Sequence, residues 1–224
     1  MTKRQVAQHK PGAAMTIGGP VPRKAKARTH GGLAGFDLIA IQTGGLEIGG
    51  QLDLSTDSSI RIVSSEGGLI HAADVLLSSV GTTLVSAQSC TGALCRAVVA
   101  DDLFRAFTGG DFALLGPARI EAGSNIEVHS GGNVTGEAGS SYRAANMLIT
   151  AENDVAIRNA AGGTLDAEGG LVFGEGTFFV NGNLTLGEAG GSGVFDLSAG
   201  LYGAAGTSID VLADTRIDTA MRSN

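Results

Sequence analysis

The chain has no tryptophan, and aromatic residues make up only 4% of its 224 residues. Proline is also scarce, with 4 residues, whereas glycine accounts for 36. Each glycine inside a helix costs about 1 kcal/mol relative to alanine, so this composition disfavours a conventional helical domain. Collagen is excluded because glycine does not recur at every third position and proline is too rare. The hydrophobic content of 43% predicts that the chain buries a core.

Long hydrophobic runs are missing as well. The uninterrupted apolar segments are a few residues long, far below the roughly 20 residues that a bilayer-crossing helix needs. No apolar stretch follows the charged start of the chain, so we expect no export by a classical secretory signal. The chain has only 2 cysteines, Cys90 and Cys95, and no histidine lies near them in sequence. A zinc site is therefore not expected, while free thiols and a short-loop disulfide both remain open.

Lysine is absent after Lys26, and the charges are divided unevenly. Residues 1–30 carry seven basic side chains and no acidic one, whereas the remaining residues carry eight basic and 22 acidic side chains. Such a basic arm is suited to nucleic acid, to an anionic membrane surface or to the acidic body of a neighbouring subunit, or it is a solvated leader. We predict that the arm binds a partner through its basic side chains: Lys3, Arg4, Lys10, Arg23, Lys24, Lys26 and Arg28.

Apolar residues from Leu46 onward recur mainly at every second position, as at Ile126 and Val128 or at Leu184 and Leu186. This alternation predicts short strands with one buried face, separated by turns that contain glycine pairs and polar residues. Between residues 120 and 217 the strands start about every 8 residues, so three strands and their turns make a coil of about 24 residues. We therefore predict an all-β fold, an elongated β-solenoid (β-helix), in preference to an antiparallel sandwich or barrel.

Residues 91–107 interrupt this pattern, because they contain one glycine and place apolar residues near helical spacing. We interpret them as an amphipathic helix that caps or interrupts the stack. Residues 1–32 hold three of the 4 prolines and are predicted to be an extended arm that does not simply continue the coil. The expected organisation is an arm at 1–32, a β-solenoid domain at 33–218 with a helical insertion at about 91–107, and a C-terminal tail at 219–224.

Two stretches of the repeats, ARIEAGSNIEVHSGGNVTGEAGS (118–140) and MLITAENDVAIRNAAGGTLDAEGGL (147–171), resemble those of filamentous-haemagglutinin-type adhesins. They are similar as well to the repetitive β-helical spikes of phage tails and related injection machines. The resemblance covers about residues 109–218 and implies a rigid, often trimeric or surface-presented structural part without catalytic residues. The secretion module of the adhesins has no match in the first 32 residues, which favours a component of a particle over an exported adhesin.

Features that could carry chemistry are interpreted as structural. The stretch GGSGVFDL at 190–197 approaches a calcium-binding nonapeptide, but Phe195 stands where an aspartate ligand belongs and the motif occurs once. Asp101 and Asp102 are neighbours on the expected helix, so their side chains diverge and do not pair as glycosidase carboxylates. The histidines lack the spacing of metal ligands, and none is assigned to catalysis: His9, His30, His71 and His129.

Other binding motifs are missing from the sequence too. Phosphate-binding glycine loops and basic patches interleaved with aromatics do not occur, so we expect no nucleotide site and no sequence-specific nucleic-acid binding. Asn133 and Asn183 begin sequons that matter only in a secretory pathway. The chain is therefore not expected to be an enzyme, and no catalytic, cofactor-binding or metal-ligating residue is predicted.

The arm and the stack together predict a structural subunit of a larger assembly, either a virion or a phage-tail-like particle. The expected partners are further copies of the chain and other assembly proteins, held partly by the basic arm. The alternatives are a surface adhesin that binds a glycan or a host protein, a cytoskeletal solenoid polymer, and a β-helical polysaccharide-degrading enzyme. The expected location is a virion or an extracellular particle, with the cell surface or the cytoplasm as alternatives.

Overall fold

The computed structural model describes the backbone of residues 14–19, 32–33, 38–43, 45–65, 69–88, 95–137, 140–157, 170–187, 193–212 and 215–219. Every secondary-structure element in these ranges is a β-strand, which confirms the all-β prediction for the described residues. The strands form two sheets, and their pairings are parallel. None of the described residues forms a helix with the length and apolarity that a membrane crossing requires.

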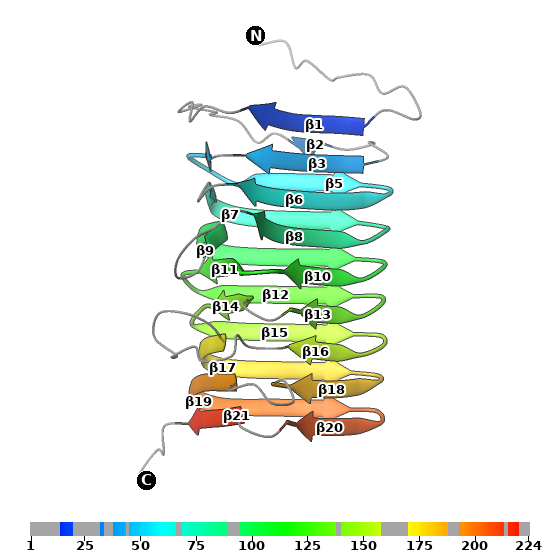
Figure 1. The fold of residues 1–224 in the computed structure, drawn as a ribbon, viewed down its shortest axis with the longest axis vertical. Coiled ribbons are helices and arrows are strands. Elements are labelled where there is room, and N and C mark those ends of the chain that lie inside the picture. The colour runs from blue at the N-terminus through cyan, green and yellow to red at the C-terminus, as the bar shows by residue number, and fades with distance from the viewer. Residues whose placement is uncertain are drawn as a thin grey trace.

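The first sheet has nine strands, which follow one another along the long axis of the molecule (Figure 1). Their order in the sheet is the order in which they occur in the chain. The strands are β1 (Ala14–Gly19), β3 (Leu38–Thr43), β6 (Ser59–Ser65), β8 (Thr83–Gln88), β10 (Phe112–Leu115), β13 (Val134–Gly136), β16 (Val155–Ile157), β18 (Asn183–Leu186) and β20 (Ser208–Val211).

The second sheet has 12 strands, and its long strands bend, so that β7, β9 and β17 each pair with three others. The strands are β2 (Gly32–Leu33), β4 (Leu46–Glu47), β5 (Leu52–Thr56), β7 (Ile70–Ser79), β9 (Cys95–Thr108), β11 (Ala118–Ala122), β12 (Asn125–Ser130), β14 (Ser141–Arg143), β15 (Asn146–Ala151), β17 (Gly170–Val180), β19 (Gly193–Ala205) and β21 (Thr215–Thr219).

The bends divide the second sheet into two flanks. The first flank consists of β4, β11, β14, β21 and the N-terminal halves of β7, β9, β17 and β19. The second flank consists of β2, β5, β12, β15 and the C-terminal halves of the same long strands. The chain runs through the first flank, the second flank and the first sheet in turn, and one such round is called a passage. Residues that are partners in consecutive passages lie 21 to 29 positions apart in the sequence. Each passage thus lies directly on the previous one.

Strand β1 falls inside the segment predicted to be an arm. It pairs in parallel with β3 from Ala14 opposite Leu38 to Gly19 opposite Thr43, and so continues the first sheet. The seven basic side chains of residues 1–30 lie outside the described residues. Residues 220–224, most of the predicted tail, also lie outside them.

Alternating side chains build the core, as the sequence pattern predicted. In β12 the side chains of Ile126, Val128 and Ser130 are buried, while Glu127 and His129 lie on the outer side. The same alternation occurs in β5 and β10. A fully buried aliphatic or aromatic side chain contributes about 1.5–3 kcal/mol relative to an exposed one, so these inward rows are the main source of stability.

Inward side chains also stack from one passage to the next. On the second flank the column Val75, Phe104, Ile126 and Met147 runs in register through β7, β9, β12 and β15. All four side chains are buried. Phe104 meets Phe112 of the first sheet edge to face, with ring centroids 6.3 Å apart and an angle of 74° between the rings. This geometry joins the two sheets across the core.

The helix predicted at 91–107 was wrong where the structure describes it, because residues 95–108 form strand β9. Residues 91–94 lie outside the described residues. The strand bends at Asp101 and Asp102, which are both exposed, and its register with β7 shifts at the same point. The bend interrupts the alternation of inward and outward residues. The buried residues therefore fall at 97, 98, 100, 104 and 106, a spacing that resembles the one expected for a helix. Pairing with β7, β11 and β12 outweighs that local pattern.

The turns between the second flank and the first sheet stack as a polar ladder. The backbone N–H and Nδ2 of Asn133 donate to Asp111 Oδ1 over 2.7 and 3.1 Å. Asn183 repeats both bonds to Asp154 Oδ1, over 2.7 and 3.0 Å. The N–H of Asp154 donates to Asn133 Oδ1 over 3.2 Å. Aspartate and asparagine alternate along this ladder, so like charges are not stacked, and both sequon asparagines hold consecutive turns together.

Hydroxyl groups fill the interior just before these turns. Ser79 Oγ lies 2.9 Å from Thr83 Oγ1 and donates to Thr108 Oγ1 over 3.1 Å. One passage further, Ser130 Oγ donates to the carbonyl of Gly110 over 2.8 Å. Buried polar groups are stable when they are hydrogen-bonded, so this internal network fixes the turns that surround it.

Candidate functional site

The outer side of the second flank carries a column of side chains from successive strands. Ser78, Phe107, His129, Thr150 and Phe179 follow one another in register from β7 to β17. They face outward because the residues on either side of each of them are buried. Phe107 is 48% exposed and Phe179 is 55% exposed, and at about 4.8 Å per strand they lie about 14 Å apart. Exposed aromatic side chains in line mark this flank as a candidate interaction surface.

The centre of the column is a stacked pair of rings. Phe107 and His129 have ring centroids 4.7 Å apart and planes 11° from parallel. His129 Nδ1 lies 2.9 Å from Thr150 Oγ1, which fixes the imidazole in this orientation. Burial lowers the pKa of His129, an effect that the Glu127 carboxylate opposes and Arg105 reinforces. The imidazole is therefore neutral at pH 7 and presents a flat ring beside Phe107.

A shallow hollow of about 350 Å³ adjoins the stacked rings. Its lining includes Phe107 and His129 together with the polar side chains of Ser78, Thr150 and Glu152. This volume lies near the lower end of the range of small-ligand sites, about 300–1,000 Å³. The hollow can hold a ligand whose C–H face packs on the rings and whose hydroxyl groups bond to the polar rim.

The charged side chains around the hollow are held in place. Arg105 Nε donates to Glu127 Oε2 over 2.6 Å, and this hydrogen bond raises the pKa of Arg105. Glu152 accepts a 2.7 Å bond from Nδ2 of Asn181 on the next turn. Arg105 and Glu127 neutralise each other beside the hollow, and Glu152 is the acidic side chain among the described residues that line it.

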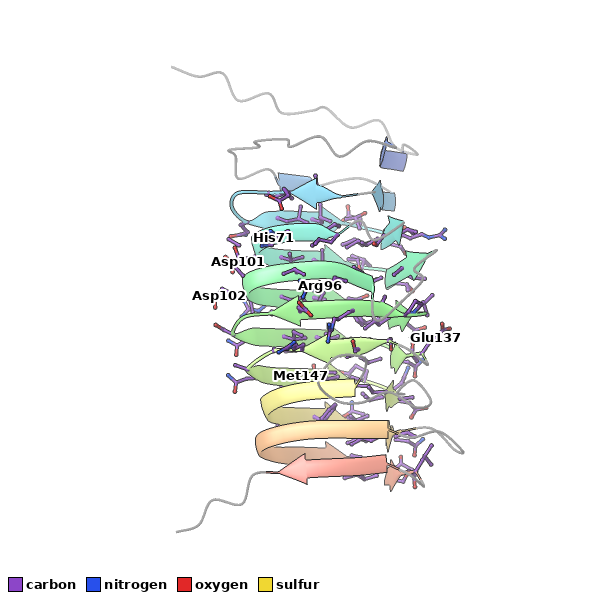
Figure 2. The ribbon with its side chains drawn as sticks, turned by 60° about the vertical axis from the view of Figure 1, so that its left-hand side comes forward. His71, Arg96, Asp101, Asp102, Glu137 and Met147 are labelled. Atoms are coloured by element: carbon purple, nitrogen blue, oxygen red, sulfur yellow. The ribbon has the colours of Figure 1, made fainter. Side chains whose placement is uncertain are left out.

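A second group of titratable side chains lies on the first flank. His71 Nε2 is 2.8 Å from Asp101 Oδ1, and His71 Nδ1 is 3.6 Å from Glu47 Oε1. Figure 2 shows His71 and Asp101 together at one edge of this flank, with Asp102 close by. The hydrogen bond to Asp101 raises the pKa of His71 against the effect of burial, and the charges of Asp101 and Glu47 add to the rise. Among the described residues, no three histidine, cysteine or acidic side chains form a group that could hold a metal ion.

Replacing His71 with glutamine should lower the free energy of unfolding in acid but not in base. The pKa of His71 is raised by folding, so its stabilisation is fully present below the unfolded value of about 6.5 and is lost as the pH rises through the folded value. The carboxylates are largely exposed, so we expect a loss of about 0.5 kcal/mol at pH 5.5 and none at pH 9. Urea unfolding at both pH values measures the difference. An equal loss at pH 9 would contradict the charge argument.

The structure places the other predicted residues as follows. Phe195 of the GGSGVFDL stretch lies in β19, with its backbone opposite Leu171 and Ile217. Cys95 begins β9, whereas Cys90 lies outside the described residues, as do His9 and His30. Of the residues considered for chemistry in the sequence, the structure thus brings Asp101 and His71 together, although the sequence pattern did not connect them.

The sequence pattern did not predict the aromatic hollow. The sequence pattern predicted a helix at Phe107 and no catalytic role for His129. The available signal was the alternation of a strand. Phe107 and His129 each directly follow a residue that is buried, so both side chains lie on the outer side. Their alignment also required the 22-residue offset between β9 and β12, which the pairing of these strands reveals.

In comparisons with known proteins, no family model, curated protein or solved structure matches the chain. Within the described residues, the hollow beside Phe107 and His129 combines ring surface, hydroxyl groups and a carboxylate. It is the candidate binding site for a ligand on the second flank.

Proposed function

We propose that the chain is a β-solenoid that serves as a stiff structural subunit of a larger assembly, such as a virion or a phage-tail-like particle. The unbroken parallel pairing of the first sheet, from β1 to β20, carries this proposal. At about 4.8 Å per strand, the sheet extends for about 38 Å. Buried columns and hydrogen-bonded turns couple each passage to its neighbours, and stacks coupled in this way form elongated scaffolds.

Strand edges at the end of the stack support contact with further subunits. Among the described residues, β20 pairs only with β18, and β21 pairs only with β19. An edge strand with free backbone groups is a template for another chain. The seven basic side chains of residues 1–30 add attraction toward the acidic remainder of a neighbouring copy, an attraction that salt weakens.

Neutralising the basic arm should dissociate the assembly. In the full chain, glutamine replaces all seven basic side chains of residues 1–30, and light scattering after size-exclusion chromatography gives the mass. We expect the wild type to be an oligomer at about 50 mM salt and to lose mass at about 500 mM, while the variant is a monomer at both. The control is Arg61→Gln, which removes an exposed arginine from β6 and should leave the oligomer unchanged. A wild type that is monomeric at both salt concentrations would contradict the proposal.

A second candidate function, a surface adhesin that binds a glycan, is favoured by the hollow on the second flank. Sugar rings present C–H faces that pack on aromatic rings and hydroxyl groups that bond to polar side chains. Phe107 and His129 supply the rings, and Thr150 and Glu152 supply polar groups at the rim. A saccharide that runs along the column would also reach Phe179, which is in register with Thr150.

Replacing Phe107 with alanine should weaken glycan binding about tenfold, because the ring stack is lost. The full chain is first applied to a glycan array, and the affinity for a bound glycan is then measured by calorimetry. Ile209→Ala is the control, since Ile209 is also an exposed apolar residue but lies on β20 of the first sheet, outside the lining of the hollow. Equal affinity of the wild type and the Phe107 variant, or no glycan bound by the wild type, would refute the adhesin function.

A further inference from the structure

Three arginines gather on the outer side of the first flank, on adjacent strands. Arg96 of β9 is in register with Arg119 of β11, which is in register with Ser141 of β14. In the next column, Glu121 is in register with Arg143. Figure 2 shows Arg96 near the middle of the face turned toward the viewer. The strand pairing thus brings residues far apart in the sequence into one cluster.

The cluster has more positive than negative charge. Glu121 Oε2 lies 3.3 Å from Arg96 Nε, and Glu121 Oε1 lies 3.0 Å from Arg119 Nη1. Arg143 forms no ion pair with any described residue, and its charge adds to the excess. Burial lowers the pKa of Arg119, and the charges of Arg143 and Arg96 lower it further, although Glu121 opposes them. Among the described residues of the cluster, one carboxylate therefore faces three guanidinium groups.

Two buried donors in this cluster have no partner. Arg119 is only 6% exposed and Ser141 only 2% exposed, yet Arg119 Nε and Ser141 Oγ make no hydrogen bond to any residue that the structure describes. Glu121 Oε1 is near Arg119 Nη1 but makes no hydrogen bond either. A buried polar group without a partner is unfavourable, most of all on a charged side chain. Neighbouring donors on Arg119 and Ser141 together with excess positive charge call for an acceptor that is itself negative.

We propose that Arg96, Arg119, Ser141 and Arg143 bind a small tetrahedral oxyanion, phosphate or sulfate. Such an ion has several acceptor oxygens that point in different directions, so one oxygen can accept from Ser141 and others from the guanidinium groups. Arginine suits this ligand because its donors are arranged as a planar fork. The ion must be small because Arg119 and Ser141 are almost fully covered. The proposal does not depend on the assembly role.

The test titrates sodium phosphate and sodium sulfate separately into the full chain, with sodium chloride holding the ionic strength constant. Calorimetry should show saturable binding of at least one anion, and the melting temperature should rise with its concentration. Arg143→Gln, at an exposed position, should weaken the apparent affinity about tenfold. Ser141→Ala should weaken it several-fold without lowering stability, because it removes an unpartnered buried hydroxyl.

Arg61→Gln is the control, because Arg61 is an exposed arginine on the first sheet. It should bind the anion as the wild type does. The same rise in melting temperature in every variant would identify a general salt effect and overturn the proposal. Heats too small to saturate with either anion, or unchanged affinity in both cluster variants, would overturn it as well.

Discussion

Replacing Phe104 with alanine is expected to lower the free energy of unfolding by about 3–5 kcal/mol. Phe104 is completely buried, and its ring meets Phe112 edge to face. It is stacked between Val75 and Ile126, whose strands are held in parallel register with β9. Neighbours fixed on both sides cannot collapse into the cavity, so the loss should lie at the large end for such a substitution. Urea denaturation followed by circular dichroism measures it.

Phe107→Ala is the matched control for this experiment. Phe107 lies on the same strand but points outward and is 48% exposed, so its loss should cost less than about 1 kcal/mol. The slope of the urea transition gives further information, because it scales with the surface exposed on unfolding. An unchanged slope means that the stack unfolds as a unit, while a smaller slope means that passages on either side of β9 unfold separately. Equal losses for the two variants would contradict the packing described for Phe104.

The short strands could be predicted because alternation is a local property. Ile126 and Val128 face inward with one residue between them, and so do Leu184 and Leu186. Each pair lies in a strand of the structure, β12 and β18. Any half-buried strand needs this pattern whatever its partners are, and a single sequence therefore contains the information.

Strand β9 and the clusters on the outer side could not be predicted in the same way. The bend at Asp101 and Asp102 disturbs the alternation, and only pairing with other passages shows that the segment is extended. The length of a passage varies from 21 to 29 residues, so the neighbours of an outward residue do not follow from a fixed repeat. The stack of Phe107 on His129 and the cluster around Arg119 both depend on that register.

Replacing Gly131 with alanine is expected to lower the free energy of unfolding by about 2–3 kcal/mol. A Cβ at this position would collide with the backbone carbonyl oxygen of Gly109 in the preceding turn. The turn cannot move away without losing hydrogen bonds, because the N–H of Gly131 donates to the Thr108 carbonyl over 2.8 Å and that of Gly132 to the Gly110 carbonyl over 3.1 Å. Urea denaturation measures the loss, with far-ultraviolet circular dichroism as the test that the strands still form.

Gly49→Ala provides the control, because a Cβ at Gly49 would meet no atom within 4 Å. Its effect should lie within about 0.5 kcal/mol of zero. If only the Gly131 variant is destabilised, glycine is needed at this position because the stacked turns approach closely. It is not needed for a backbone angle that other residues rarely adopt. The Cβ of an alanine at 131 would point along the stack at the Gly109 carbonyl of the turn below, where the spacing of about 4.8 Å leaves no room for it. If both variants were equally stable, the turns would have to separate freely, and the stack would be less stiff than its hydrogen bonds indicate.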